Sequence, residues 1–258
     1  MRQRSPRRAR SVTRPLWVRP GWEVCVNTAD AKPSVLQIAF AFAYVLALPV
    51  LLLWLSGNWR WPEGWVFTIW FLGLCYVTIL YLYRNDPALL SERYRRPGTG
   101  GQSVWDLFVV IGLVVGFTAW IVLMPLDSQR FGWSPPFPVW LQVLGLAMLV
   151  GSSVLFFRSY KDNPYVSALV RVQEDRGQQV VSTGVYGFVR HPMYLGGSLL
   201  FLGAPLLLGS VWGLVVGSAL VLLLAARIVG EERTLAADLE GYEEYRLKVK
   251  YRLVPGIW

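Results

Sequence analysis

The chain has 258 residues, of which 54% are hydrophobic and 16% are charged. Soluble domains carry charge on roughly 25% of their residues, so this composition excludes an ordinary soluble domain and indicates a membrane protein. The formal net charge of +9 fits contact with lipid headgroups better than nucleic-acid binding, and we expect no nucleic-acid partner. Cys25 and Cys75 are far apart and Cys75 lies in an apolar stretch, so neither a disulfide framework nor a metal site is indicated.

Residues 1–33 are rich in arginine and contain scattered proline and tryptophan, with no apolar core of a secretory signal. We expect this segment to be a basic, disordered tail on the cytoplasmic side. An organelle transit peptide is the alternative, which Glu23 and the prolines fit poorly.

Long apolar runs predict membrane-spanning helices, each of which needs about 20 mostly apolar residues. Four such runs make residues 34–157 a four-helix transmembrane region, and they lie near 35–56, 64–83, 104–126 and 138–157.

The apolar stretch 193–229 is too long for one crossing at about 1.5 Å per residue. Gly209 and Ser210 mark a turn, so we expect a hairpin of helices 193–208 and 211–229, the first short and bent at Pro205. The predicted fold class is therefore all-α: a polytopic membrane protein with about six transmembrane helices.

The basic residues support this count, because lysine and arginine accumulate in cytoplasmic loops. With six spans, all but two of the 25 lysines and arginines fall on one side of the membrane, and only Arg60 and Arg130 fall on the other. We therefore expect both termini to be cytoplasmic.

This topology brings several polar segments to one face, within a predicted catalytic region of residues 158–258. The motif RHPMY (190–194) begins the first hairpin helix and RIVGEER (227–233) ends the second, while the loop 158–190 and the C-terminal region join them. Each motif also has a structural explanation: proline is common at a helix start, and basic or acidic residues often mark a membrane interface. Charge near a bilayer nevertheless tends to face a cavity or a partner, and Arg227 stands one turn before Glu231, placed for an i,i+4 pair.

These segments also carry a family resemblance. STGVYGFVRHPMYLG, followed after one hairpin by EERTLAADLEGYEEYRLKVKYRLVPGIW, resembles the isoprenylcysteine carboxyl methyltransferase family and the related membrane phospholipid methyltransferases, over roughly residues 160–258. The resemblance implies an integral membrane enzyme that uses S-adenosylmethionine at the cytoplasmic face, with Arg227 facing the acceptor. It places the cofactor contacts on Gln173, Gln178, Gln179, Val180, Val181, Tyr186, His191, Pro192, Met193, Tyr194 and Glu231. Many members of the family have a histidine where this chain has Gln178.

The residue types suit this chemistry. Methyl transfer from a sulfonium needs positioning and exclusion of water more than a covalent nucleophile or a metal. Backbone N–H groups beside Pro192 and Met193 could bind the cofactor carboxylate, and Glu231 could bind its ammonium or a hydroxyl. We expect His191 to form a hydrogen-bonding wall of the cofactor site, not to act as a general base.

The sequence favours a carboxylate as the methyl acceptor but does not identify the molecule that carries it. A carboxylate is ionised at neutral pH and needs no base, and the planar fork of Arg227 could orient it. The surrounding spans suggest a lipophilic or lipid-modified acceptor that enters from the bilayer: a prenylated cysteine, a phospholipid, or a small lipophilic acid or thiol. The alternatives are a phospholipid N-methyltransferase, an NADPH-dependent sterol-type reductase and a non-enzymatic membrane protein.

The charge distribution makes a testable prediction about topology. Reporter fusions at Gly57, Gly98, Ser134 and the C-terminus should read outside, inside, outside and inside. A C-terminal fusion that reports the outside would contradict both the six-span count and the convergence of the polar segments.

Overall fold

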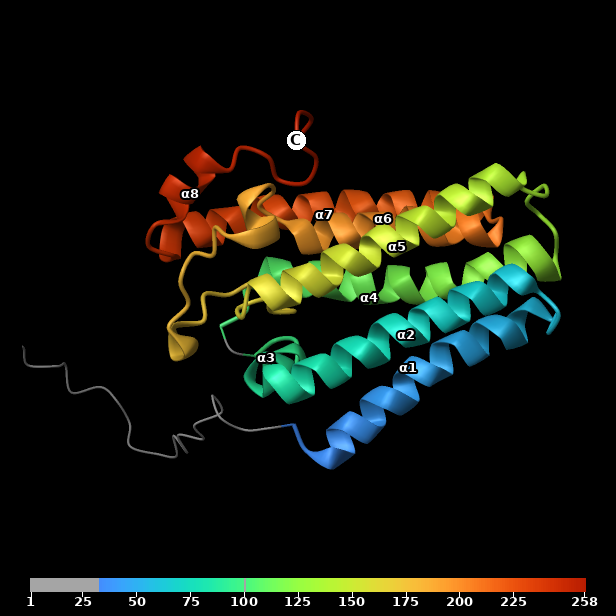
Figure 1. Ribbon diagram of the computed structural model, residues 1–258, viewed down its shortest axis with the longest axis horizontal. Coiled ribbons are helices and arrows are strands. Elements are labelled where there is room, and N and C mark those ends of the chain that lie inside the picture. The colour runs from blue at the N-terminus through green and yellow to red at the C-terminus, as the bar shows by residue number, and fades with distance from the viewer. Residues whose placement is uncertain (1–32, 100) are drawn as a thin grey trace, which may run out of the picture.

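Six apolar helices run side by side along the longest axis of the molecule (Figure 1). This computed structural model describes residues 33–99 and 101–258, so the prediction for the tail lies outside the described residues except at Pro33. The long helices are α1 (Val35–Ser56), α2 (Pro62–Asn85), α4 (Val104–Pro125), α5 (Val139–Asp162), α6 (Pro192–Leu208) and α7 (Val211–Asp238). Two short helices, α3 (Pro87–Arg93) and α8 (Tyr242–Lys248), lie at one end of the bundle.

Each of the four predicted N-terminal spans coincides with a long helix, with shifts at the ends. Within residues 33–99 and 101–258, five helices are long and apolar enough to cross a membrane, and α6, at 17 residues, is a sixth, shorter apolar helix. The predicted hairpin is also present, with Gly209 at its turn in the left-handed region at φ 73°. Helix α7 continues to Asp238, well beyond the predicted end at 229, because its last charged turns pack against neighbouring polar segments, which hydropathy does not reveal.

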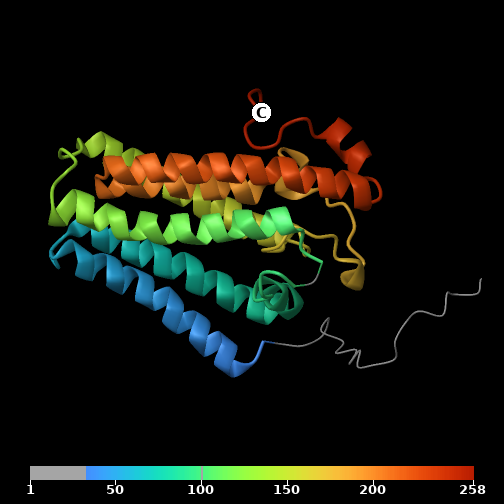
Figure 2. The same ribbon diagram turned by 180° about the vertical axis from the view of Figure 1, so that it is seen from behind.

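The two ends of the bundle differ in composition. We call the end formed by α3, residues 163–191, α8 and residues 249–258 the polar end. The opposite end holds the short connections between α1 and α2, α4 and α5, and α6 and α7 (Figures 1 and 2). Arg60 and Arg130 lie in those short connections, as the distribution of basic residues predicted. The segments predicted to converge lie together at the polar end.

Glycines allow α6 to pack closely against α5 and α7. A Cβ atom at Gly203 of α6 would lie 2.9 Å from the carbonyl oxygen of Gly145 in α5, and one at Gly217 of α7 would overlap the carbonyl oxygen of Phe201 in α6. Ser152 of α5 also donates a hydrogen bond of 2.7 Å to the carbonyl of Gly196. Close approach of this kind is the usual source of helix association in membranes, and it fixes α6 between its two neighbours.

The turn between α6 and α7 is held by one buried carboxylate from another segment. Asp127 belongs to a π-helical turn, η2 (Leu126–Arg130), and its side chain is fully buried. Its Oδ2 accepts hydrogen bonds from the hydroxyls of Ser134 and Ser210, both at 2.6 Å, and from the backbone N–H of Trp212 at 3.2 Å. These bonds anchor the hairpin at the end away from the polar segments.

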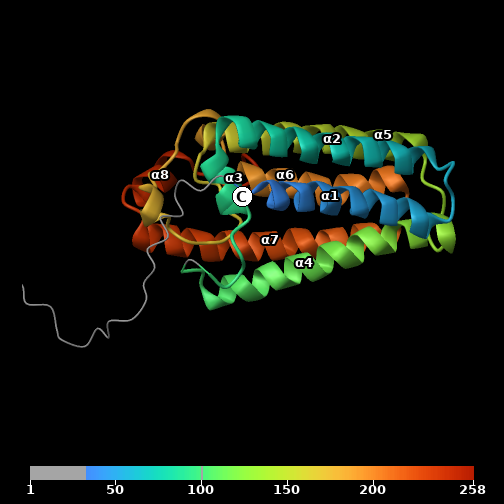
Figure 3. The same ribbon diagram turned by 90° about the horizontal axis from the view of Figure 1, so that it is seen from below.

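A second buried carboxylate ties α4 to α7, which lie side by side in Figures 2 and 3. Asp106 is fully buried, and its Oδ1 accepts a hydrogen bond of 2.8 Å from Nε of Arg227. Its Oδ2 accepts from the backbone N–H of Val170 at 3.0 Å and from Gln102 at 2.6 Å. The carboxylate therefore joins α4, α7 and the loop that follows α5.

We expect Asp106→Asn to destabilise the protein strongly. The substitution leaves the buried guanidinium of Arg227 without a counter-charge, and breaking a buried pair in this way costs about 3–5 kcal/mol. In detergent-purified protein, the apparent melting temperature should fall by roughly 6–20 °C, at about 2–4 °C per kcal/mol for a chain of this size.

Asp175→Asn is the matched control. Asp175 is also paired with arginine, but its side chain is 41% exposed, and exposed pairs contribute about 1 kcal/mol or less. Equal melting temperatures for the two variants would contradict the structural role of Asp106.

Candidate active site

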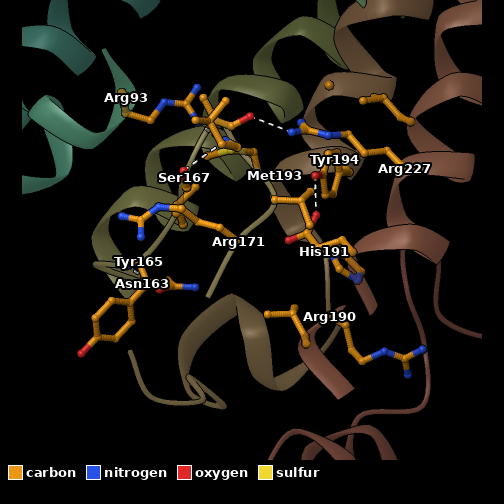
Figure 4. A pocket seen from close by; sticks show the side chains of 18 of the residues that line it. Arg93, Asn163, Tyr165, Ser167, Arg171, Arg190, His191, Met193, Tyr194 and Arg227 are labelled. Carbon is orange, nitrogen blue, oxygen red and sulfur yellow. Dashed lines mark hydrogen bonds between the residues drawn. The ribbon is translucent and has the colours of Figure 1, made fainter. Parts of the chain in front are cut away.

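The polar end encloses a cavity of about 450 Å³ between α4, α6, α7 and the loop that follows α5. One part of its wall is apolar and comes mainly from the membrane-spanning helices: Val110, Leu113, Val114, Phe117, Phe156, Leu200, Phe201 and Leu224. The other part is polar and comes from the polar end: Asn163, Tyr165, Arg171, Gln178, Tyr186, His191, Tyr242 and Tyr245. Figure 4 shows labelled side chains of α3, α6, α7 and the loop that follows α5 arranged around this space.

Most of the predicted site residues line this cavity. They are Gln178, Gln179, Val180, Val181, Tyr186, His191, Met193, Tyr194, Arg227 and Glu231. Segments separated by more than 50 residues in sequence therefore contribute to one wall, as the predicted topology required.

Gln173 and Pro192 do not line the cavity. The side chain of Gln173 is buried beneath the loop, where its Nε2 donates to the carbonyl of Tyr165 at 2.6 Å and its Oε1 accepts from Arg176 at 2.8 Å. Its backbone N–H donates to Oε1 of Gln178 at 2.7 Å. Gln173 therefore holds two cavity-lining residues in place, while Pro192 begins α6.

Glu231 and Tyr194 form the centre of the polar wall. The hydroxyl of Tyr194 donates a short hydrogen bond to Oε2 of Glu231. No lysine, arginine or histidine among the described residues lies within ion-pairing distance of Glu231, so its charge is not neutralised by a direct partner. The His191 ring packs beside Tyr194, with ring centroids 5.5 Å apart.

The next residue, Glu232, has the opposite environment and was not predicted as a site residue. It is 3% exposed. Its Oε1 accepts from Nε of Arg190 at 2.6 Å and contacts Nε2 of His191 at 3.3 Å, and its Oε2 accepts from Nε of Arg252 at 2.8 Å. An ionised carboxylate only accepts hydrogen bonds, so this contact puts a hydrogen on Nε2 of His191.

Backbone pairing reinforces this cluster. The N–H groups of Arg190 and His191 donate to the carbonyls of Tyr251 and Arg252, both at 2.9 Å. The guanidinium of Arg190 also donates to the carbonyls of Val249 and Lys250, at 2.6 and 2.8 Å. The C-terminal segment therefore fixes the residues that begin α6. The paired motifs RH and EE in the sequence carry a signal for this cluster, although they do not reveal which glutamate is buried.

Arg227 does not form the expected pair with Glu231. Its Nη2 donates to the carbonyl of Ala168 at 2.6 Å, in addition to the bonds with Asp106, and its guanidinium lies over the ring of Tyr194 at 5.9 Å (Figure 4). Asp106 is 121 residues earlier in the chain, so local helix spacing could not identify it as the partner.

Tyrosines close the cavity on the side of α8. The hydroxyl of Tyr245 donates to the carbonyl of Tyr186 at 2.7 Å. Burial raises the pKa of both phenols, so they stay neutral at physiological pH and act as polar but uncharged wall groups. Within residues 33–99 and 101–258, no group of three or more histidine, cysteine, aspartate or glutamate side chains is arranged to hold a metal ion.

Comparisons with known proteins agree with the resemblance in the sequence. Residues 140–239 match the family described as phospholipid methyltransferase. The chain is 35% identical over 85 residues to a protein-S-isoprenylcysteine O-methyltransferase of Schizosaccharomyces pombe, covering 32% of this chain and 36% of that protein. It is 27% identical over 168 residues to the delta(14)-sterol reductase TM7SF2 of Mus musculus, covering 57% and 38%.

A solved structure of the eukaryotic intramembrane Ras methyltransferase ICMT aligns with a TM-score of 0.44 and 19% identity, covering 87% of each chain. The chain spans little more than a third of the length of the two curated relatives. The matching region contains α6, α7 and the loop that lines the cavity. Over this region, the chain is similar to membrane methyltransferases of the phospholipid and isoprenylcysteine type.

Proposed function

We propose that this protein is an S-adenosylmethionine-dependent methyltransferase that acts on a lipophilic acceptor bearing a carboxylate. The observation that carries the proposal is one cavity with two kinds of wall: a polar wall containing Glu231 and the start of α6, and an apolar wall from the membrane-spanning helices. A water-soluble donor and a lipophilic acceptor could meet in such a cavity.

The polar wall fits the cofactor. The cavity volume of about 450 Å³ is in the range of small-molecule sites, about 300–1,000 Å³. Helix α6 has no side-chain cap at its N-terminus, so its first N–H groups are available to a carboxylate. Glu231 has no ion-pair partner among the described residues and is suited to an ammonium.

When bound, S-adenosylmethionine would supply an electrophilic methyl group: a carboxylate oxygen of the acceptor would form a bond to the methyl carbon and give an ester, while the methyl–sulfur bond would break and leave its electrons on sulfur. The chain's own residues would position the reactants and exclude water. His191, held by Glu232, and Tyr194, held by Glu231, form a rigid part of this wall. No proton has to be removed from an ionised acceptor, so no general base is required.

We further propose that the polar end faces the cytoplasm. Nearly all lysines and arginines belong to segments at that end or to the N-terminal tail, which is the side that basic loops occupy. The cofactor would then enter from the cytoplasm and the acceptor from the bilayer.

A second candidate, a sterol-type reductase, is favoured by the similarity to the delta(14)-sterol reductase. NADPH carries phosphates that arginines usually bind. Of the four arginines that line the cavity, Arg171, Arg190 and Arg227 already hold carboxylates of the chain. That pairing favours the methyltransferase, and direct binding of S-adenosylmethionine or NADPH to the purified protein distinguishes the two functions.

A phospholipid N-methyltransferase is the remaining enzymatic alternative. An amine acceptor must lose its proton before it attacks a methyl group, which calls for a base within reach. His191 is the chain's single histidine, and its Nε2 faces the buried Glu232. That nitrogen is therefore not placed to take a proton from an amine. An anionic acceptor needs no base, so we prefer it.

Substituting Glu231 tests the cofactor site. Glu231→Gln keeps the shape of the side chain and removes its charge, and a hydrogen bond to a charged group contributes about 1.5–3 kcal/mol. We expect the affinity for S-adenosylmethionine to fall at least about tenfold in equilibrium titrations.

Glu240→Gln, which removes an exposed carboxylate just beyond α7, is the control and should bind the cofactor normally. A folded Glu231→Gln protein with unchanged affinity would move Glu231 out of the cofactor site. Wild-type protein that binds NADPH and not S-adenosylmethionine would overturn the proposed function.

The acceptor-orienting role of Arg227 stays a prediction, and its contacts suggest how it would act. A lysine at this position keeps the charge but cannot bridge Asp106 and Ala168 with a planar fork, so the wall that faces the acceptor should shift. A misplacement of about 1 Å can lower a rate by on the order of a hundredfold. We expect Arg227→Lys to lose methyl transfer while cofactor affinity stays nearly normal.

Arg233→Lys, on an exposed position of the same helix, should keep full activity. Near-normal turnover of Arg227→Lys, or an equal loss of cofactor binding, would contradict the assignment.

A further inference from the structure

A second, larger cavity of about 1,010 Å³ lies between the N-terminal helices and the site just described. Its wall is mainly apolar and comes from α1, α2, α3 and α5; it includes Phe40, Ala41, Val45, Phe71, Cys75 and Ile79. Two of the lining side chains near its outer edge, Leu36 and Phe40, are 80% and 72% exposed. In a membrane-spanning chain, that edge of the cavity faces lipid. We call this cavity the lateral groove.

The lateral groove and the candidate active site share part of their walls. Tyr44, Arg93, Phe156 and Leu200 line both. The two spaces therefore adjoin at these four side chains, three of which are hydrophobic or aromatic and one of which is cationic.

Arg93 is the charged group at this junction. It is the last residue of α3, is half-buried, and reaches toward the cavity in Figure 4. Its Nη1 lies 3.8 Å from the sulfur of Met193, and its guanidinium lies over the ring of Tyr160 at 5.4 Å. Neither neighbour carries a negative charge.

Arg93 differs in this respect from the other arginines of the cavity wall. Arg171 pairs with Glu92 at 2.9 Å, Arg190 with Glu232 at 2.6 Å, and Arg227 with Asp106 at 2.8 Å. In the part of the chain that the structure describes, no carboxylate lies within ion-pairing distance of Arg93. A partly buried, unpaired guanidinium is costly beside a bilayer and calls for an anionic partner.

We propose that the lateral groove holds the apolar chain of the acceptor and that Arg93 binds the acceptor's carboxylate where the groove meets the active site. This inference rests on the proposed function and names the binding site of its substrate: a single-chain lipophile with one terminal carboxylate. The groove supplies the apolar surface for the chain, and the planar fork of Arg93 matches a carboxylate. The head group then lies beside Met193, on the wall proposed for the cofactor.

A role for Arg93 in holding the cofactor is the competing assignment. The cofactor's carboxylate has its own proposed site at the start of α6, whereas Arg93 is shared with a groove whose wall is mainly apolar. The two assignments predict different losses: the acceptor assignment predicts weaker acceptor binding with intact cofactor binding, and the cofactor assignment predicts the reverse.

Photolabelling tests the proposal without relying on turnover. Protein in phosphatidylcholine nanodiscs would be irradiated with hexadecanoate carrying a diazirine near the end of its chain, at a pH of about 9, where the carboxylate is ionised even beside lipid. We expect label on peptides that contain Phe40, Cys75 or Ile79. The corresponding uncharged amide should label these peptides at least about tenfold less, because it lacks a charge-assisted bond.

Two pairs of variants locate the interaction. Arg93→Gln should reduce carboxylate labelling to the level of the amide while S-adenosylmethionine affinity stays normal, and Arg93→Lys should restore part of it. Arg84→Gln, an exposed arginine of α2 that lines neither cavity, is the charge control. Thr78→Trp fills the groove and should block labelling, whereas Val77→Trp, on the exposed side of the same helix, should not.

The possible failures are distinct. Carboxylate and amide labelling that are equal in the wild type, or unchanged in Arg93→Gln, would overturn the inference, and so would loss of cofactor binding in Arg93→Gln. Competition by anionic phosphatidylglycerol as effective as competition by unlabelled hexadecanoate would assign the groove to a membrane lipid and also overturn it. Wild-type protein that labels as expected but binds no S-adenosylmethionine would refute the proposed function and, with it, the identification of the bound lipophile as a methyl acceptor, while the binding of a single-chain carboxylate by Arg93 in the groove would remain.

Discussion

The burial of Glu232 is the interaction on which the rest of the site depends. A carboxylate that is 3% exposed is tolerated only when it is paired and fully hydrogen-bonded. Arg190, His191 and Arg252 provide this pairing, and they come from the start of α6 and from the C-terminal segment. The position of His191, the opening turn of α6 and the C-terminal cover of the cavity are therefore set by one charge on α7.

Adjacent glutamates on α7 serve opposite purposes because neighbouring residues of a helix point about 100° apart. Glu232 faces the cluster of arginines and has a structural role, whereas Glu231 faces the cavity and contacts only Tyr194 by hydrogen bond. The arginines also divide into two roles. Arg171 and Arg227 are paired with carboxylates and support the walls, whereas Arg93 has no carboxylate partner among the described residues. The polar end thus neutralises the charges that build it and leaves Glu231 and Arg93 without an ion-pair partner among the described residues at the wall of the candidate active site.

Much of the architecture could be predicted because its signals are local. Apolar runs located the spans, Gly209 and Ser210 located the hairpin, and the distribution of basic residues brought the polar segments to one end. Most of the predicted site residues line one cavity. Many of them belong to the motifs RHPMY (190–194) and RIVGEER (227–233), which lie at neighbouring ends of α6 and α7. The tail before residue 33 lies outside what the structure describes.

The interactions that could not be predicted are between distant segments or involve buried polar groups. Asp106 looks like an ordinary first-turn acid of α4, and nothing near it in sequence identifies Arg227 as its partner. Gln173 resembles a surface residue but is buried, because the loop around it needs a donor and an acceptor. The lateral groove depends on how α1 and α2 pack, which periodicity alone does not determine.

Helix α6 is only 17 residues long, or roughly 25 Å at the rise of an α-helix, whereas the hydrocarbon core of a bilayer is about 30 Å thick. The turn at its far end is anchored by Asp127; with that turn at one surface of the hydrocarbon core, a helix of this length would place its first residues inside the opposite surface. The proposed methyl donor and acceptor would then meet at a depth set by the length of one helix. Such an enzyme would be sensitive to bilayer thickness, since a thicker membrane would lengthen the path from water to His191 and a thinner one would open the cavity to solvent.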